Sequence, residues 1–225
     1  MDSVPPRSAI LQLLLSKSQI KQQVYDTTFA AFQTFKDVLH ELASEVNDEI
    51  FEVDKRIKLE YRDRGQYEAE LRIAGDVLVF NMHSNVFQFD PSHKVWKTEY
   101  LQGDANNAYC GMISVYNFLT DSFKYNRMDD LGYLTERIFV NQNNHFFVEG
   151  KHQHSFDYQN FGVEAITREN ITKIAEAAIH YALTFDLFVP PYDTMHIVNV
   201  AQITNKADDD KIQTGKRIGF EFGLN

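Results

Sequence analysis

The first fifth of the chain has the periodicity of an amphipathic helix. Apolar residues recur three or four positions apart, while charged and amide side chains occupy the other positions. Pro5-Pro6 favours a helix that starts near Ser8, and Ser16-Lys17-Ser18 is the place where a break is expected. We therefore predict a helical segment over residues 1–50 that packs its apolar stripe on a core. The stripe consists of Ile20, Val24, Phe29, Ala31, Phe32, Phe35, Val38, Leu39, Leu42 and Val46.

From about residue 55 the pattern changes to the alternation of a strand. Apolar residues occupy odd-numbered positions before and after a polar turn. For the odd-numbered residues of both strands to share one face, the paired positions must sum to an even number, which requires a loop with an odd number of residues. Asp63-Arg64-Gly65 would form a loop of three residues, with glycine at the position that needs a positive φ. In this register Lys58 lies opposite Glu70.

Further strands are predicted as far as residue 150. The stretch "DVLVFNM" follows a turn at Gly75-Asp76 and is apolar on both faces, which is typical of a central strand. Residues 109–123 are so crowded with apolar side chains that helix and strand both fit. The polar run 141–144 predicts a hairpin loop between the last two strands. The candidate strands are 86–89, 95–99, 112–119, 133–140 and 144–149.

A second helix is predicted over residues 167–188. One face carries Ile171, Ile174, Ala175, Ala178, Ala182 and Phe185, and Pro190-Pro191 follows. Beyond it, residues 194–222 are predicted to hold two terminal strands around a polar loop. With no repeat and no change of composition along the chain, we expect a single domain over 1–225. Its class should be α+β, with a large, mainly antiparallel sheet packed by the long N-terminal helical segment and a C-terminal helix.

Composition and charge narrow the class of protein. The 18 phenylalanines and 11 tyrosines favour sheet. The net charge of -10 disfavours a general nucleic-acid binder, which needs Lys and Arg to contact phosphates. A single cysteine, Cys110, excludes an internal disulfide and is typical of a reducing compartment, so we predict a cytoplasmic protein. The apolar run 10–15 is too short to span a bilayer, and no membrane partner is expected.

The stretch "HFFVEGKHQHSFDY" holds three of the eight histidines and raises the question of a metal site. Such a site needs at least three converging ligands. In a continuous strand, His152 and His154 would share a face with the apolar residues Phe146 and Val148, whereas His145 would point the other way. The three histidines could converge only if the strand were broken, which Gly150 would allow. No metal and no other cofactor is therefore predicted, and His152 and His154 are retained as the candidate metal ligands.

Other catalytic patterns are incomplete in this sequence. Cys110 has no histidine near it in the chain to make it a nucleophile. His40-Glu41 begins like a zinc-protease helix but lacks the second histidine, and Asp208-Asp209-Asp210 lacks the glycine of a calcium loop. No phosphate loop, dinucleotide fingerprint or nucleophile elbow occurs. No catalytic residue is predicted, although dispersed catalytic residues leave the enzyme question open.

Three stretches together resemble a known group of proteins. They are "EYRDRGQYEAELRIAGDVLVFNMHSNVF", "FLTDSFKYNRMDDLGYLTERIFVNQNNHFFVEGK" and "FDLFVPPYDTMHIVNVAQI". They are similar to an uncharacterised family of conserved proteins from Bacteroidetes-type bacteria, over about residues 20 to 203. The resemblance implies a bacterial cytoplasmic protein and carries over no activity, cofactor or site.

Two functional hypotheses follow from these patterns. The first is a non-enzymatic cytoplasmic binding or protein-interaction module, which uses an aromatic-lined sheet surface or the N-terminal helix. The alternative is a metal-dependent or other enzyme that uses His152 and His154 with a distant partner such as His83 or His196. The wide N-terminal stripe favours a homodimer over a helix that is buried between the sheet and the 167–188 helix of its own chain.

Overall fold

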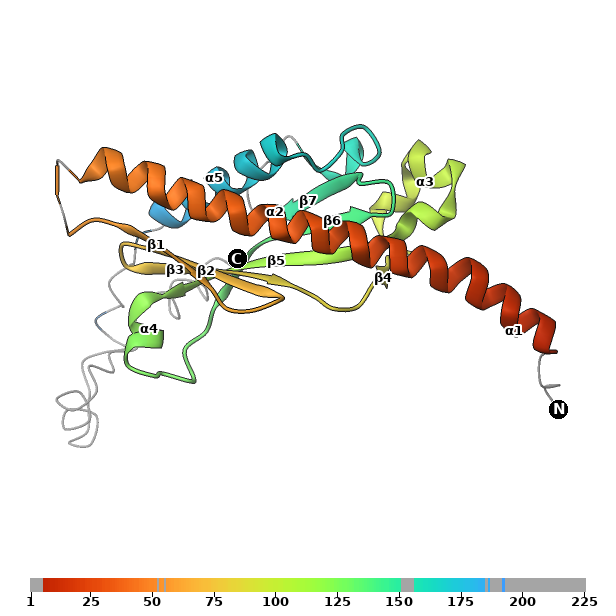
Figure 1. Cartoon of the computed structure of the whole chain (residues 1–225), viewed down its shortest axis with the longest axis horizontal. Coiled ribbons are helices and arrows are strands. Elements are labelled where there is room, and N and C mark those ends of the chain that lie inside the picture. Colours follow the sequence, from red (N-terminus) through yellow and green to blue (C-terminus); the bar gives the residue numbers. More distant parts are fainter. Residues whose placement is uncertain are drawn as a thin grey trace.

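The computed structural model describes residues 6–51, 53–54, 56–150, 156–184, 186 and 192. Two helices lie on one face of an antiparallel sheet (Figure 1). The α+β class predicted from the sequence, with a long N-terminal helical segment and a C-terminal helix, is confirmed. The predicted terminal strands of residues 194–222 lie outside the described residues.

The N-terminal segment is one continuous helix. It comprises α1 (Arg7–Leu13), a π-helical stretch (Leu14–Ser18) and α2 (Gln19–Ile50). Pro6 precedes the first helical residue, close to the predicted start. The break expected at residues 16–18 is absent, because a π turn widens the helix there without interrupting it. At 1.5 Å per residue the helix is roughly 65 Å long, and Figure 1 shows that it crosses the sheet and extends beyond it.

The sheet has seven strands in the order β1-β2-β3-β5-β6-β7, with β4 beside β5. Every described pairing is antiparallel. As predicted for "DVLVFNM", β3 is a central strand. Residues 109–119 form a strand that is mostly buried on both of its faces, and the short helix α4 (Thr120–Lys124) follows it. The strands are β1 (Leu59–Asp63), β2 (Glu68–Ile73), β3 (Asp76–Met82), β4 (Phe87–Gln88), β5 (Tyr109–Leu119), β6 (Tyr133–Asn141) and β7 (Phe146–Gly150).

The strand predicted over 95–99 was wrong. This region forms a 3-10 turn (Lys94–Lys97), the short helix α3 (Glu99–Gly103) and a second 3-10 turn (Ala105–Ala108). The ring Nδ1 of His93 accepts a hydrogen bond from the Val95 amide, 3.2 Å away, and the indole of Trp96 donates to the carbonyl of Asp90 at 2.9 Å. These local bonds stabilise a turn in place of a strand ladder. The strand predicted over 86–89 is reduced to the two residues of β4.

The first hairpin confirms the predicted parity but not the predicted register. Leu59 pairs with Ile73, so the positions sum to an even number and the odd-numbered apolar residues share a face. The expected pairing of Lys58 with Glu70 was wrong, since Arg62 lies opposite Glu70. The shift arises because Asp63 is itself paired within the ladder, which moves the loop toward β2.

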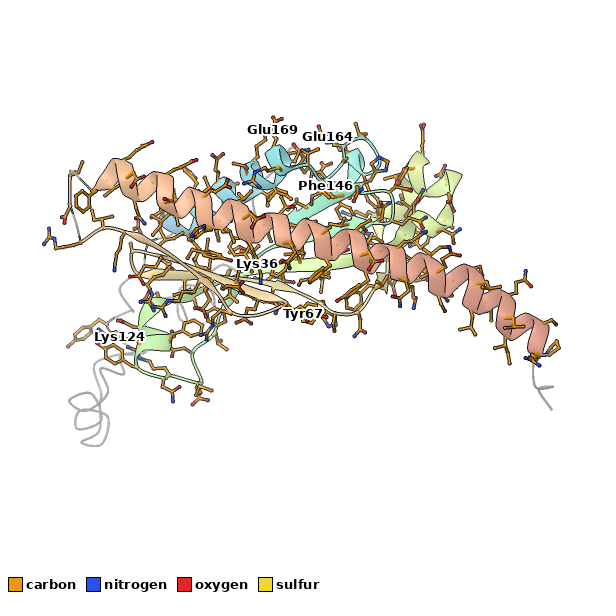
Figure 2. All side chains as sticks on the ribbon, in the orientation of Figure 1. Lys36, Tyr67, Lys124, Phe146, Glu164 and Glu169 are labelled. Atoms are coloured by element: carbon orange, nitrogen blue, oxygen red, sulfur yellow. The ribbon has the colours of Figure 1, made fainter. Side chains whose placement is uncertain are left out.

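A buried lysine anchors this hairpin to the long helix. The ammonium of Lys36 donates to Oδ1 of Asp63 at 2.8 Å and to the carbonyl of Gly65. Figure 2 shows Lys36 on the side of α2 that faces the strands. The hydrogen bond from Lys36, with a second from the Gly65 amide, holds the pKa of Asp63 below its ordinary value. A charged side chain of α2 thereby fixes the position of the turn between β1 and β2.

Gly65 adopts the positive φ that the sequence predicted, with a value of +110°. No atom lies within 4 Å of the position that a Cβ would occupy, so the cost of a side chain comes from backbone strain alone. We expect Gly65→Val to lower the free energy of unfolding by roughly 1 kcal/mol or more, measured by denaturant titration. Gly75→Val is the control, because this turn glycine also has free space and its φ lies outside the left-handed region. Equal stability of the Gly65→Val variant and the native protein would contradict the expected strain.

The main core lies between the sheet and two helices, α2 and α5 (Arg168–Thr184). Of the helix predicted over 167–188, residues 168–184 are helical, and residues 185, 187 and 188 lie outside the described residues. The stripe of α2 packs on the sheet and beside α5, so most of it is buried within one chain. Its buried members include Val24, Ala31, Phe32, Phe35, Val38 and Leu39. No helix among the described residues is long and apolar enough to cross a membrane.

Candidate functional site

A second apolar cluster occupies the opposite face of the sheet, near β6 and β7. Successive side chains of a strand point to opposite faces of the sheet. Ile138, Val140, Phe146 and Val148 point to the helices, so Phe139 and Phe147 point to the opposite face. The segment of residues 94–108 and a 3-10 turn (Tyr158–Asn160) supply the covering layer. The buried members are Val95, Leu101, Ala108, Cys110, Phe139, Phe147 and Phe161, and Phe89, Trp96, Tyr100, Met112 and Tyr158 pack against them.

A cavity of about 670 Å³ opens at the edge of this cluster, between the 94–100 and 158–163 segments. Its volume is in the range of sites that hold small organic molecules. Three aromatic residues belong to the lining, and we call its exposed charged side chains, Lys94, Lys97 and Glu99, the mouth. The lining residues are Lys94, Lys97, Thr98, Glu99, Tyr100, Tyr158, Gln159, Phe161, Gly162 and Val163.

Tyr100 is held rigidly in the wall of the cavity. Its hydroxyl lies 2.7 Å from Nδ1 of His145, 2.9 Å from Nδ2 of Asn141 and 3.1 Å from Nδ2 of Asn143. The two amides donate to the hydroxyl oxygen, and a hydroxyl has one proton to give, so the Tyr100 hydroxyl can donate to Nδ1 of His145. These three contacts use the hydrogen-bonding capacity of the phenol and fix the direction of its ring.

Glycine at position 162 lets the chain approach that ring closely. Its φ is +93°, and a Cβ there would lie 2.5 Å from Cδ2 of Tyr100. Phe161 is buried next to it, with its ring 5.2 Å from the Tyr100 ring in an edge-to-face arrangement. The backbone at Gly162 therefore packs flat against Tyr100 and helps to shape one side of the cavity.

The charges at the mouth of the cavity are mainly positive. Lys94 and Lys97 are exposed, and neither forms an ion pair within the described ranges. Glu99 is the one acidic side chain among the described residues of the lining. The two ammonium groups thus create a local positive potential on a protein whose net charge is -10.

Two histidines form hydrogen bonds near this site, His145 with Tyr100 and His93 with Glu149. His145 supports Tyr100, as described, and forms an isolated bridge with Ala165. Nε2 of His93 lies 2.9 Å from Oε1 of Glu149, whose other oxygen accepts a hydrogen bond from Arg137 at 2.6 Å. His93 was not singled out by the sequence, because Glu149 lies 56 positions further along the chain.

The metal hypothesis concerns residues that the structure mostly does not describe. His152, His154 and His196 lie outside the described residues. His83, the other suggested partner, accepts a hydrogen bond from the Asn85 amide, and its ring contacts the Phe87 ring edge-to-face. Within the described ranges, no three His, Cys, Asp or Glu side chains are grouped closely enough to hold a metal ion.

Cys110 lies at the start of β5 beneath the second cluster and is fully buried. Burial raises the pKa of its thiol far above the ordinary value. Its Sγ lies 4.0 Å from the carbonyl of Asn107, the one hydrogen-bond partner of the thiol in the described part of the chain. The thiol therefore stays protonated at neutral pH and packs as a small apolar group.

The fold and the cavity define an α+β protein with a ligand-sized site on the face of the sheet that the long helix leaves free. Comparison with protein-family models, with curated proteins and with solved structures finds no match.

Proposed function

We propose that this chain is a non-enzymatic, cytoplasmic binding protein, and that its cavity takes a small organic anion with a planar, aromatic body. One observation carries the proposal. Two ammonium groups without ion-pair partners in the described chain, on Lys94 and Lys97, stand at the mouth of a cavity walled by Tyr100, Tyr158 and Phe161. The cytoplasmic location is supported by the single cysteine.

The chemistry of the lining suits such a ligand in two ways. Aromatic side chains contact planar ligands through stacking and edge-to-face geometry, and they bury large areas at low entropic cost. The ammonium groups of Lys94 and Lys97 attract an anionic substituent and orient it toward the mouth. The ligand would then lie with its planar body against Tyr100 and Tyr158 and its charge at the rim.

The same lining supports binding in preference to catalysis. A general base or an activated nucleophile needs a side chain that is free to exchange a proton. The Tyr100 hydroxyl is already engaged by three partners, and His145 lies behind it, as the partner of that hydroxyl. No histidine or cysteine is among the described residues that line the cavity, and the one carboxylate of the lining, Glu99, is exposed to solvent rather than buried against the aromatic wall.

The proposal can be tested with 1-anilinonaphthalene-8-sulfonate, a fluorescent aromatic anion. We expect saturable binding to the native protein, and about tenfold weaker binding to a Lys94→Ala/Lys97→Ala variant that has lost both rim charges. The matched control is Lys58→Ala/Lys173→Ala, which removes two exposed lysines elsewhere. It changes the net charge equally and should bind the probe as the native protein does.

A third variant separates the cavity from other apolar surfaces. Tyr158→Ala removes an aromatic wall and should also weaken binding of the probe, whereas Leu14→Asp/Leu15→Asp, which changes the exposed helix end, should not. If the native protein and the Lys94→Ala/Lys97→Ala variant bound the probe with the same affinity, the cavity would not be the anion site.

A further inference from the structure

The N-terminal end of the long helix carries an apolar surface that no described part of the chain covers. Figure 1 shows α1 extending beyond the end of the sheet where β4 and α3 lie. The side chains there are 45% to 71% exposed, whereas Val24, further along the same helix, is fully buried. We call residues 7–21 the arm. Its exposed apolar residues are Ile10, Leu11, Leu13, Leu14 and Leu15.

The arm is basic, although the protein is acidic. Arg7, Lys17 and Lys21 are its charged residues, and it contains no Asp or Glu. The ammonium groups of Lys17 and Lys21 lie 5.7 and 5.8 Å from the centre of the Tyr109 ring, at the start of β5. Further toward its N-terminus, the arm presents its aliphatic side chains between these two lysines and Arg7.

The other end of the same helix has the opposite character. Residues 37–50, which we call the acidic end, contain no Lys or Arg, and all five of their carboxylates are exposed. Glu41 is paired with Arg168, while the other four form no ion pair with any residue of the described ranges. Leu42, Val46 and Ile50 form a partly buried apolar strip beside them, and the inner sides of Leu42 and Val46 pack on the main core. The carboxylates are those of Asp37, Glu41, Glu45, Asp48 and Glu49.

We propose that two copies of this chain form a two-fold dimer in which the arm of each lies on the acidic end of the other. The two surfaces are at opposite ends of one helix, and between Lys17 and Glu45 it rises about 42 Å. When two such helices lie antiparallel, both arm-to-acid contacts form at once, as a two-fold interface requires. The aliphatic side chains of each arm then pack against the strip of Leu42, Val46 and Ile50.

Charge selects this arrangement over a pairing of the arms with each other. Two antiparallel arms would bring Arg7 of one copy near Lys21 of the other, with no acidic residue in either arm to offset the repulsion. On the acidic end, the same cations meet four carboxylates that form no ion pair within the described chain, those of Asp37, Glu45, Asp48 and Glu49. The occupant of the arm surface is thus a second copy of this chain.

The test uses the full chain and two charge-reversal variants in light scattering and native mass spectrometry. The native protein should have a mass of about twice the 26.1 kDa of one chain at high micromolar concentration. The arm variant is Lys17→Glu/Lys21→Glu, and the end variant is Glu45→Lys/Asp48→Lys. Each variant by itself should be mainly monomeric, because both arm-to-acidic-end contacts of its dimer would bring like charges together.

An equimolar mixture of the two variants should form a heterodimer. Each reversed arm then meets a reversed acidic end, and each native arm meets a native acidic end. The arm variant also loses the contacts of Lys17 and Lys21 with Tyr109 of its own chain, and mixing does not restore them. Recovery of the dimer in the mixture would therefore show that the charges act between the two copies. Unchanged thermal midpoints of the single variants show that both remain folded.

Three results would overturn the proposal. The first is a native mass of 26.1 kDa at every concentration. The second is an end variant that dimerises like the native protein, which would indicate that the arms pair with each other. The third is a native monomer that floats with phosphatidylglycerol vesicles but not with phosphatidylcholine vesicles, which would assign the arm to an anionic lipid surface.

Discussion

Replacing Gly111 with alanine should lower the free energy of unfolding by about 3 kcal/mol, because it forces apart two tightly packed layers. Gly111 lies in β5 directly beneath α2. An alanine Cβ would lie 2.7 Å from Cβ of Thr28 and closer still to its hydroxyl oxygen. Rotation of the Thr28 side chain gives no relief, since its Cβ belongs to the rigid part of the helix. The helix or the strand would have to move.

Urea unfolding followed by circular dichroism measures this loss. Gly103→Ala is the matched control, because Gly103 lies in α3 with no atom within 4 Å of the added Cβ, and its stability should change by less than about 1 kcal/mol. Adding Thr28→Gly to the Gly111→Ala variant removes the clashing Cβ and should recover part of the loss. A Gly111→Ala variant as stable as the native protein would show that α2 does not approach β5 as closely as the structure indicates.

Phe35→Ala should cost roughly 3–5 kcal/mol, the usual range for deleting a buried aromatic ring. Phe35 is fully buried between α2 and the sheet, with its ring 6.1 Å from that of Phe80 in β3. Its removal leaves a cavity at the centre of the main core, where neither the helix nor the strand can collapse inward without disturbing the other.

Phe51→Ala provides the comparison for that measurement. Phe51 follows the last residue of the same helix and is 56% exposed, so its replacement should change the free energy of unfolding by no more than about 1 kcal/mol. Equal losses for the Phe35 and Phe51 variants in urea titrations would contradict the packing of the apolar stripe on the sheet.

The two proposals use different residues of the molecule. The proposed ligand site lies on the face of the sheet opposite α2, with Lys94 and Lys97 at its rim. The proposed dimer uses the exposed side of the long helix and its arm. Loss of probe binding in the lysine variant should therefore leave the mass in solution unchanged. Failure of one proposal can accordingly be told apart from failure of the other.

Local patterns determined the class of fold. The stripe of residues 20–46 predicted a long amphipathic helix, and the alternation after residue 55 predicted strands joined by a turn at Gly65. These predictions were correct because the 3.6-residue and 2-residue periods are set by the geometry of one element and the face that it buries. The parity of the first hairpin was correct for the same reason.

The sequence was ambiguous wherever contacts with distant residues decide the register or the secondary structure of a segment. Each residue of β1 pairs with a residue of β2 four positions later than predicted, and this shift leaves the parity unchanged. The hydrogen bonds from Lys36 to Asp63 and Gly65 are formed in the observed register. Residues 109–119 became a strand because β3 and β6 pair with them on either side. The prediction of a strand over residues 95–99 was wrong because five residues are too few to outweigh the local bonds of His93 and Trp96.

The candidate site could not be predicted at all from local patterns. Tyr100 contacts His145, which lies 45 positions further along the chain. Gly162 lies against the Tyr100 ring because both belong to the layer that covers the face of the sheet opposite α2. Periodicity along the chain specifies which face of an element is buried, and therefore the class of fold. Which distant residues meet on that face depends on strand order and register, and these were decided only by the tertiary packing.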